Sequence, residues 1–166
     1  MNNNILIYVV EDNKLLNKLV VDFLKKKGLK RIKFFYTGQD CLKAVKSGGR
    51  PDVVIQDYHL EDSTGIAVLQ AVKKRSKRSE FIFLTANEDM EVAVNSIKYG
   101  AFDYIIKDND LALKKVYNKI EKISKVLELE KRNRFIKGIM IITLAIFGVV
   151  VILMVMHEVF DLFGLK

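Results

Sequence analysis

The stretch that decides the fold is residues 51–59, which read PDVVIQDYH. Its centre, residues 53–55, is a short apolar run, and the chain's only proline stands just before it. An apolar run that does not alternate with polar residues is typical of a strand buried on both faces, as in a parallel sheet covered by helices. Asp57 ends this run, and we therefore expect it at the carboxyl end of a strand.

Four more short apolar runs occur before residue 110, at residues 5–10, 32–36, 81–84 and 104–106. The segments between them carry apolar residues three or four positions apart, the spacing of one face of a helix. These residues are Leu15, Leu16, Leu19, Val20, Phe23 and Leu24, then Leu42 and Val45, then Ile66, Leu69 and Val72, and finally Val92, Val94 and Ile97. Five strands that alternate with helices predict a doubly wound α/β domain with a parallel sheet.

Chemically active side chains follow the apolar runs. Glu11 and Asp12 follow the first run, Asp57 the third, Thr85 the fourth and Lys107 the fifth. In an open α/β sheet the carboxyl ends of the strands line the reactive crevice, so we expect these side chains to converge. Clustered carboxylates without His or Cys suit Mg²⁺, and an Asp can serve as the nucleophile toward phosphorus. The set predicts a magnesium-dependent phosphoryl site.

Each residue also has a structural explanation. Asp12 could cap a helix that begins near Asn13, Asp57 and Thr85 could be turn residues at strand ends, and Lys107 could be a surface charge. The phosphoryl site is favoured because the structural explanation needs five independent coincidences at the ends of four strands.

These five positions, with Tyr104 three residues before Lys107, resemble the receiver domain of bacterial two-component response regulators over roughly residues 4–125. The resemblance implies a flavodoxin-like (βα)5 sheet of strand order 2-1-3-4-5. It also implies that Asp57 accepts a phosphoryl group from a histidine kinase or a phosphotransfer protein. The implied Mg²⁺ ligands are Glu11, Asp12, Asp57 and the backbone carbonyl of His59.

The resemblance assigns roles to further residues. Thr85 and Lys107 would contact the phosphoryl group, and Thr85 and Tyr104 would form the conformational switch. His59 and Asn87, two positions beyond Asp57 and Thr85, would tune dephosphorylation.

The sequence departs from the family pattern in two loops. Asp108 stands where the family usually has a proline after its lysine, which predicts a different loop there. Leu60 and Glu61 replace the common Met-Pro pair, although Gly65 is retained.

Residues 138–156 form an apolar run, GIMIITLAIFGVVVILMVM, that explains how a chain with 28 Lys and Arg has a mean hydropathy of +0.12. As a helix it would extend about 28 Å, close to the roughly 30 Å of a bilayer core. Four basic residues precede the run and one follows it, which predicts a cytoplasmic N-terminal domain on a bacterial inner membrane. We expect a receiver at 1–125, a basic juxtamembrane helix at 126–137, a transmembrane helix at 138–157 and a short tail at 158–166.

The apolar run could instead be a buried dimerisation helix of a soluble protein. The helix expected from residue 111 has an apolar stripe of its own, formed by Leu113, Val116, Ile120, Ile123 and Leu127. This stripe predicts either packing on the sheet or a possible homodimer.

The net charge of +8 raises nucleic acid as a partner. The basic run at residues 73–78 is better explained as a solvated helix end, and no helix-turn-helix follows, so we expect no nucleic-acid partner.

We therefore predict a membrane-tethered single-domain response regulator that signals to an unknown downstream protein by direct contact. Apart from Mg²⁺-dependent self-phosphorylation and autodephosphorylation, it should not be an enzyme. The alternatives are a phosphohydrolase with an aspartyl nucleophile and a membrane adaptor that works without phosphorylation. The lone cysteine, Cys41, is expected to be a small buried residue in a reducing compartment.

Overall fold

The computed structural model describes residues 4–108 and 111–162 of the 166-residue chain. The chain divides into two compact units, Met1–Lys125 and Val126–Lys166. The elements are β1 Ile7–Val10, α1 Lys14–Lys26, β2 Ile32–Phe35, α2 Gly38–Lys46, β3 Val53–Gln56, β4 His59–Leu60, β5 Ser63–Thr64, α3 Gly65–Arg75, β6 Glu80–Thr85, α4 Met90–Lys98, β7 Asp103–Ile106 and α5 Leu111–Leu162.

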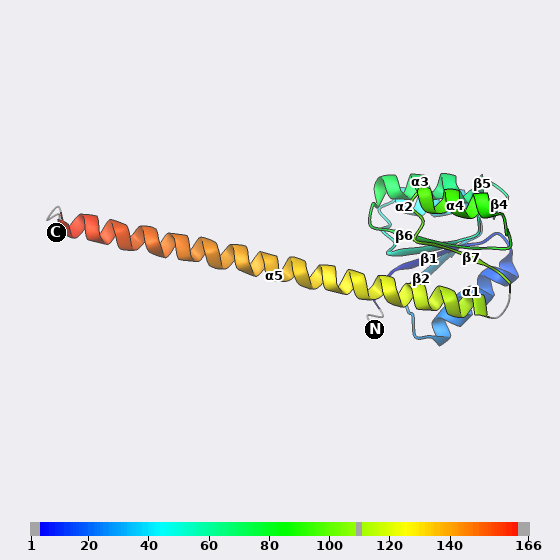
Figure 1. Cartoon of the computed structure of the whole chain (residues 1–166), viewed down its shortest axis with the longest axis horizontal. Coiled ribbons are helices and arrows are strands. Elements are labelled where there is room, and N and C mark those ends of the chain that lie inside the picture. The colour runs from blue at the N-terminus through cyan, green and yellow to red at the C-terminus, as the bar shows by residue number, and fades with distance from the viewer. Residues whose placement is uncertain (1–3, 109–110, 163–166) are drawn as a thin grey trace. The chain divides into compact units, whose positions relative to one another are not determined.

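The first unit is built on a parallel five-stranded sheet of order β2-β1-β3-β6-β7. This order confirms the expected 2-1-3-4-5 topology of a doubly wound, flavodoxin-like fold. Helices α2, α3 and α4 cover one face of the sheet, and α1 and the beginning of α5 cover the other (Figure 1). The register pairs Val10 with Gln56 and Thr85 with Ile106, so the carboxyl ends of the strands are aligned.

Burial follows the position of each strand in the sheet. The inner strands β1 and β3 are buried throughout, and β6 is buried from its second residue. The edge strands β2 and β7 are partly exposed, with Phe34 at 50% exposure. The expectation that all five runs are buried on both faces is therefore wrong for the edges, where a strand has a neighbour on one side only.

Two helices bury different faces from those expected. In α1, Leu15 and Leu19 are 75% and 50% exposed, whereas Asn17 is buried. The buried amide of Asn17 is satisfied because it donates hydrogen bonds to the carbonyls of Glu11 and Phe35. In α4 the only buried residue is Ser96, and the expected stripe residues Val94 and Ile97 are exposed. The reason is that α4 packs mainly against the edge strand β7, which covers little of its apolar surface.

Local signals explain where the helices begin and end. Asn13 caps α1, and its side chain accepts hydrogen bonds from the backbone N–H groups of Leu15 and Leu16 at 3.0 and 3.1 Å. The alternative role of Asp12 as this cap is therefore wrong. The chain takes positive φ angles at Gly28 and Gly100, directly after the C-caps of α1 and α4, where glycine adopts this conformation without strain.

A two-residue antiparallel hairpin, β4 with β5, was not expected from the sequence. It lies in the loop that follows Asp57, where the family's Met-Pro pair is missing. Cys41 is fully buried, as expected.

Helix α5 begins in the first unit and supplies its last core residues. Val116, Ile120 and Ile123 are buried there as expected, whereas Leu113 is half-buried. Leu127 belongs to the second unit.

The described part of the second unit is the remainder of α5, which carries mainly exposed apolar side chains from residue 135 to residue 156. Among the described residues, this helix is the one long and apolar enough to cross a membrane, judged by length and composition. None of its most apolar 18-residue window is buried.

Candidate functional site

The aligned strand ends bring one ammonium group between two carboxylates. Lys107 Nζ donates to Glu11 Oε2 at 2.6 Å and to Asp57 Oδ2 at 2.7 Å. These residues are separated by 96 and 50 positions in the chain, so only the sheet register brings them together. The backbone N–H of Lys107 donates to the carbonyl of Thr85 at 2.8 Å, which holds the end of β7 beside β6.

This ion cluster is largely removed from water. The side chains of Glu11, Asp57 and Lys107 are 5%, 15% and 16% exposed. Burial raises the pKa of Glu11 above its usual value, although the Lys107 ammonium opposes the change. For Lys107, burial acts to lower the pKa, but its hydrogen bonds to Asp57 and Glu11 outweigh burial and the pKa is raised. Lys107 is therefore a cation at neutral pH and holds two carboxylates beside it.

The donors at this edge suit a hard divalent cation. Mg²⁺ in proteins is usually bound by one or two carboxylates, with water and phosphate oxygens completing its shell. Glu11 and Asp57 provide two carboxylates that already share one cationic partner. In the described parts of the chain, no cluster of three or more His, Cys, Asp or Glu side chains is preassembled for a metal. The fit to Mg²⁺ therefore rests on this pair.

The other two expected ligands lie in the loop region beside the pair. Asp12 Oδ2 accepts a hydrogen bond from the backbone N–H of Glu61 at 3.2 Å. Asp57 Oδ1 accepts one from the backbone N–H of His59, also at 3.2 Å. The loop after β3 is thus held against both Asp12 and Asp57, which places the His59 backbone next to the carboxylate of Asp57.

Asn87 links three of the residues that the sequence singled out. Its side-chain nitrogen lies 3.0 Å from His59 Nε2, and its backbone N–H donates to Thr85 Oγ1 at 3.3 Å. Its carbonyl accepts the hydroxyl hydrogen of Tyr104 at 2.8 Å. The Asn87 side chain also accepts a bond from the backbone N–H of Asp89, the N-cap of α4. A chain of hydrogen bonds therefore connects buried Thr85 to the beginning of α4.

Tyr104 lies half-buried among aromatic side chains. Its ring centroid is 6.1 Å from that of Phe83 and 6.5 Å from that of Tyr58. Burial, together with electrostatic repulsion from Tyr58, Asp57 and Asp89, raises the pKa of Tyr104 to about 12. The hydroxyl is consequently protonated at neutral pH and can donate to Asn87.

Two structural residues of the site were not identified from the sequence. Asn17 joins the ends of β1 and β2 by its bonds to the carbonyls of Glu11 and Phe35. Its signal was a polar residue inside an apolar stripe. Asp62 accepts from the backbone N–H groups of Gly38 and Gln39 at 2.9 and 2.8 Å, and so ties the loop after β3 to the beginning of α2. Asp62 had no local signal, because its partners are distant in the sequence.

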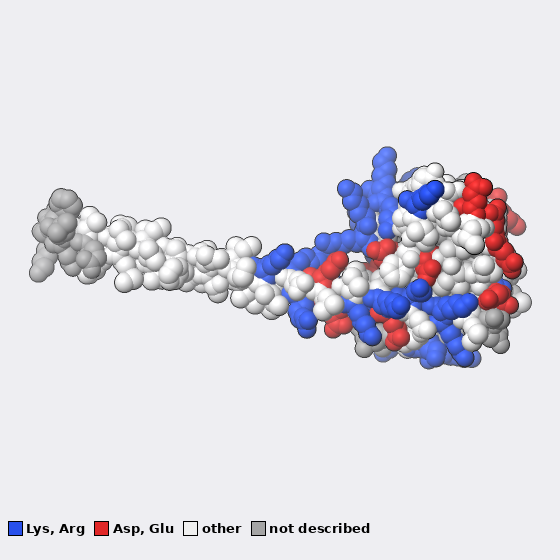
Figure 2. All heavy atoms as spheres, viewed as in Figure 1, with Lys and Arg blue, Asp and Glu red and all other residues white. Residues whose placement is uncertain are grey.

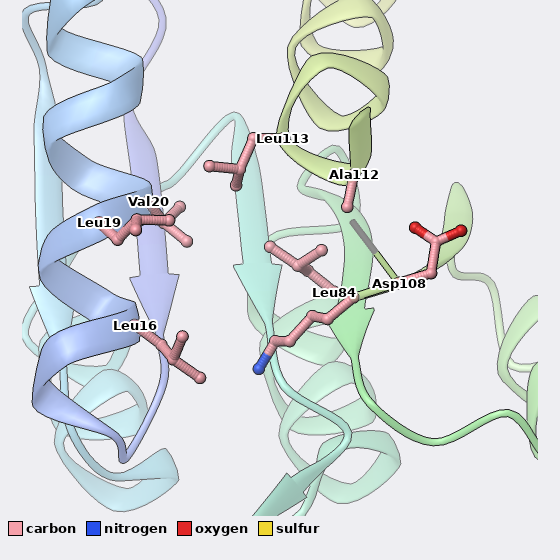
Figure 3. Close-up of a pocket in the computed structure, with 8 residues that line it drawn as sticks. Leu16, Leu19, Val20, Leu84, Asp108, Ala112 and Leu113 are labelled. Atoms are coloured by element: carbon pink, nitrogen blue, oxygen red, sulfur yellow. The ribbon is translucent and has the colours of Figure 1, made fainter. Parts of the chain in front are cut away.

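An apolar pocket of about 200 Å³ opens beside Lys107. In Figure 3, Leu16 and Leu19 of α1 face Leu113 of α5 across the pocket, and Leu84 lies between the helices. The complete lining is Leu16, Leu19, Val20, Leu84, Lys107, Asp108, Ala112 and Leu113.

A model of the response regulator receiver domain matches residues 7–120. The chain belongs to this family. The receiver is 35% identical over 106 residues to the regulatory protein LuxO of Vibrio cholerae, a match that covers 61% of this chain and 23% of LuxO. It is 31% identical over 106 residues to the DNA-binding transcriptional regulator NtrC of Escherichia coli (strain K12), covering 64% and 22%. The chain thus spans about a quarter of the length of these curated relatives.

Solved receivers have the same architecture. The BeF3-activated DrrB receiver domain matches with a TM-score of 0.61 and 29% identity, covering 70% of this chain and 97% of that one. The response regulator TrrA of Thermotoga maritima, solved in complex with Mg²⁺-BeF, matches with a TM-score of 0.62 and 26% identity, covering 70% and 96%. Receivers are phosphoacceptor domains that bind Mg²⁺ at the phosphorylation site and interact with histidine kinases or phosphotransfer proteins.

Proposed function

We propose that this chain is a membrane-tethered response-regulator receiver whose phosphoacceptor is Asp57. The observation that carries the proposal is the Lys107 ammonium, which lies between Asp57 and Glu11 at the carboxyl edge of a receiver sheet. The direct test is to incubate the full chain with acetyl phosphate and Mg²⁺. One phosphoryl group should be added, and hydroxylamine should release it, because that reagent cleaves acyl phosphates.

The proposed reaction transfers a phosphoryl group to an Asp57 oxygen. That oxygen attacks phosphorus, a P–O bond forms, and the P–N bond to the donor histidine breaks with its electron pair leaving on the imidazole. Glu11, Asp12, Asp57 and the backbone carbonyl of His59 would hold Mg²⁺, which would neutralise charge on the phosphoryl oxygens. Lys107 would contribute a second positive charge, exchanging its bond to Asp57 for one to the phosphoryl group.

The hydrogen bonds around Asn87 support a route for the signal. If the Thr85 side chain turned so that its hydroxyl reached the phosphoryl group, Oγ1 would move away from the Asn87 backbone N–H that donates to it at 3.3 Å. The carbonyl of Asn87 holds Tyr104 and its side chain holds the cap of α4, so both would move with it. We assign the switch to Thr85 and Tyr104, and the surface that changes to α4.

Dephosphorylation would be tuned by the pair His59 and Asn87. Their side chains contact each other at 3.0 Å, close to the end of β3. Together they would control how water approaches the phosphoryl group on Asp57.

The phosphodonor protein would dock at the pocket between α1 and α5. Leu19 lines this pocket and is 50% exposed, and its neighbour on α1, Leu15, is 75% exposed. Changing Leu19 to Asp should reduce phosphotransfer from a phosphorylated histidine protein at least about tenfold, since a carboxylate in an apolar contact is poorly solvated. The initial rate with acetyl phosphate should stay within twofold of wild type, because a small donor needs no docking surface.

The matched control is Ile97→Asp on α4, where the wild-type side chain is 48% exposed. It should leave phosphotransfer from the protein donor unchanged. Equal rates for the Leu19 variant and wild type with the protein donor would remove the pocket from the proposal.

The tether would be the apolar part of α5. We propose a single-pass inner-membrane protein with the receiver in the cytoplasm, residues 126–137 as the juxtamembrane segment and 138–157 as the span. The end of the proposed tail, residues 163–166, lies outside the described residues. Exposed apolar side chains along the proposed span support this assignment. After alkaline carbonate extraction of membranes the chain should remain in the pellet, and recovery in the supernatant would refute the tether.

A further inference from the structure

The edge of the receiver where the strands begin is rich in exposed basic side chains. Four helices end at this edge, and each has Lys or Arg in its last turn. Cations in the last turn favour the helix dipole, which accounts for these residues. Helix α3 ends at Arg75, so the helix-end explanation expected for residues 73–78 does not extend to Lys77 and Arg78. These two residues and Arg50 are exposed in the loops that lead into β6 and β3. The loop cations therefore need another explanation.

The acidic side chains at the same edge are already engaged. Asp52 Oδ2 accepts from the backbone N–H of Leu6 at 2.7 Å, and Glu80 pairs with Lys73 at 3.2 Å. Asp103 pairs with Lys119 of α5 at 2.6 Å. The excess positive charge is consequently carried by exposed Lys and Arg side chains.

Arg50, Arg75, Lys77 and Arg78, which we call the basic edge, line a hollow of about 380 Å³ between the end of α3 and the beginning of β3, together with Pro51, Asp52 and Ser76. Figure 2 shows Lys and Arg side chains gathered over the end of α3 and Asp and Glu side chains along the opposite side of the same unit. The charges of the receiver are therefore unevenly distributed. The carboxylate site lies at the carboxyl ends of the strands, and the basic edge lies at the end where the strands begin.

The first unit of the chain also ends towards the end of the sheet where the strands begin. Near the beginning of α5, Lys115 lies 3.7 Å from Asp108, just beyond the carboxyl end of β7. One turn later, Lys119 reaches Asp103, the first residue of β7. Helix α5 thus runs from the site edge towards the strand beginnings, and Lys125 lies one to two turns further along.

We propose that the basic edge docks on the anionic phospholipid headgroups of the membrane that holds the tether. This inference rests on the proposed membrane span. Residues 126–137 of α5 are helical and cover about 18 Å. The headgroup layer occupies roughly 5–8 Å of that length. The remaining gap of about 10 Å is comparable to the distance over which charges interact in physiological salt. Docking would direct the phosphorylation site away from the bilayer and towards soluble partners.

The test uses the full chain in lipid nanodiscs of two compositions, phosphatidylcholine alone and phosphatidylcholine with phosphatidylglycerol. Lysine acetylation rates are measured by mass spectrometry. Lys74 and Lys77 should react about fivefold more slowly in the anionic discs, because a basic residue near such a surface is held there. Lys18, exposed on α1, should react equally in both discs. In 1 M salt, where screening acts within about 3 Å, the difference should disappear.

A double variant, Arg50→Gln with Arg78→Gln, separates charge from fold. In this variant, Lys77 should be acetylated less than about twofold more slowly in anionic discs than in neutral discs. Its thermal unfolding should stay unchanged, since both replaced side chains are exposed. A chain that stays in the discs but shows equal acetylation rates of Lys77 in neutral and anionic discs overturns the docking and leaves the tether intact. A chain that does not stay with the discs overturns the tether, and the docking with it.

Discussion

Replacing Asp57 by Asn should abolish labelling of the full chain by acetyl phosphate and Mg²⁺. The amide has almost the same shape and keeps an oxygen for the backbone N–H of His59, which now donates to Asp57 Oδ1. It lacks the anionic oxygen that attacks phosphorus and cannot form an acyl phosphate. The measurement is the hydroxylamine-labile phosphoryl group on the intact chain, detected by mass spectrometry.

The matched control is Asp22→Asn, which removes an exposed carboxylate from α1. It should be labelled like wild type. Circular dichroism melting of both variants establishes that the loss of label is not a loss of fold. A label that persists in the Asp57 variant would place the acceptor elsewhere and refute the proposed function.

Replacing Lys107 by Met should lower the free energy of unfolding by about 3 kcal/mol at neutral pH, since removing one partner of a buried ion cluster leaves its charge uncompensated. Lys107 is 16% exposed and contacts both Glu11 and Asp57. Millimolar Mg²⁺ should recover part of the loss in the variant by supplying a cation to the same two carboxylates. Chemical unfolding with and without Mg²⁺ measures both effects.

The stability lost in the Lys107→Met variant should depend on pH in a defined direction. The pKa of Glu11 is raised in the folded chain above its ordinary value of 4.5, so the folded state favours the protonated acid. The favourable contribution of protonated Glu11 is complete below pH 4.5 and is lost as pH rises through the raised pKa. Without Lys107 this pKa should rise further. The variant should therefore approach wild-type stability in acid and diverge from it towards neutral pH.

Lys115→Met is the control for charge removal. Its ammonium lies 3.7 Å from Asp108, and both side chains are about half exposed. Such a surface pair is worth about 0.5 kcal/mol, so its loss should hardly change unfolding. Equal stability of Lys107→Met and wild type at neutral pH would mean that the cluster is not held by this ammonium.

Much of the fold could be predicted because its signals are local. The apolar runs and helical spacings depend on neighbouring residues, and Gly28 and Gly100 mark helix ends by their own backbone preference. The order of the sheet came from the family resemblance. The exposed face of α4 and the partial exposure of β2 were not predictable from periodicity, because a pattern does not report how much partner surface exists.

The candidate site, like the fold, was predictable from the sequence only in part. Strand-end position alone selected Glu11, Asp57 and Lys107 as a set. Their ion cluster depends on the register of three strands, which sets the distances from Lys107 Nζ to the two carboxylates. The hydrogen bonds that Asp62 accepts from the beginning of α2 had no sequence signal, since the partners are more than 20 residues apart.

By itself, the sequence determined the α/β class, the polar residues at the ends of four of the five strands and the apolar character of the C-terminal helix. These properties follow from residue type and spacing along one chain. Only the tertiary structure decided that one ammonium serves two carboxylates, that Asn87 joins Thr85 to Tyr104, and that Arg50 lines the same hollow as Arg75 and Arg78. The physical reason is that each depends on distances between residues far apart in sequence, and packing of the sheet against its helices sets those distances.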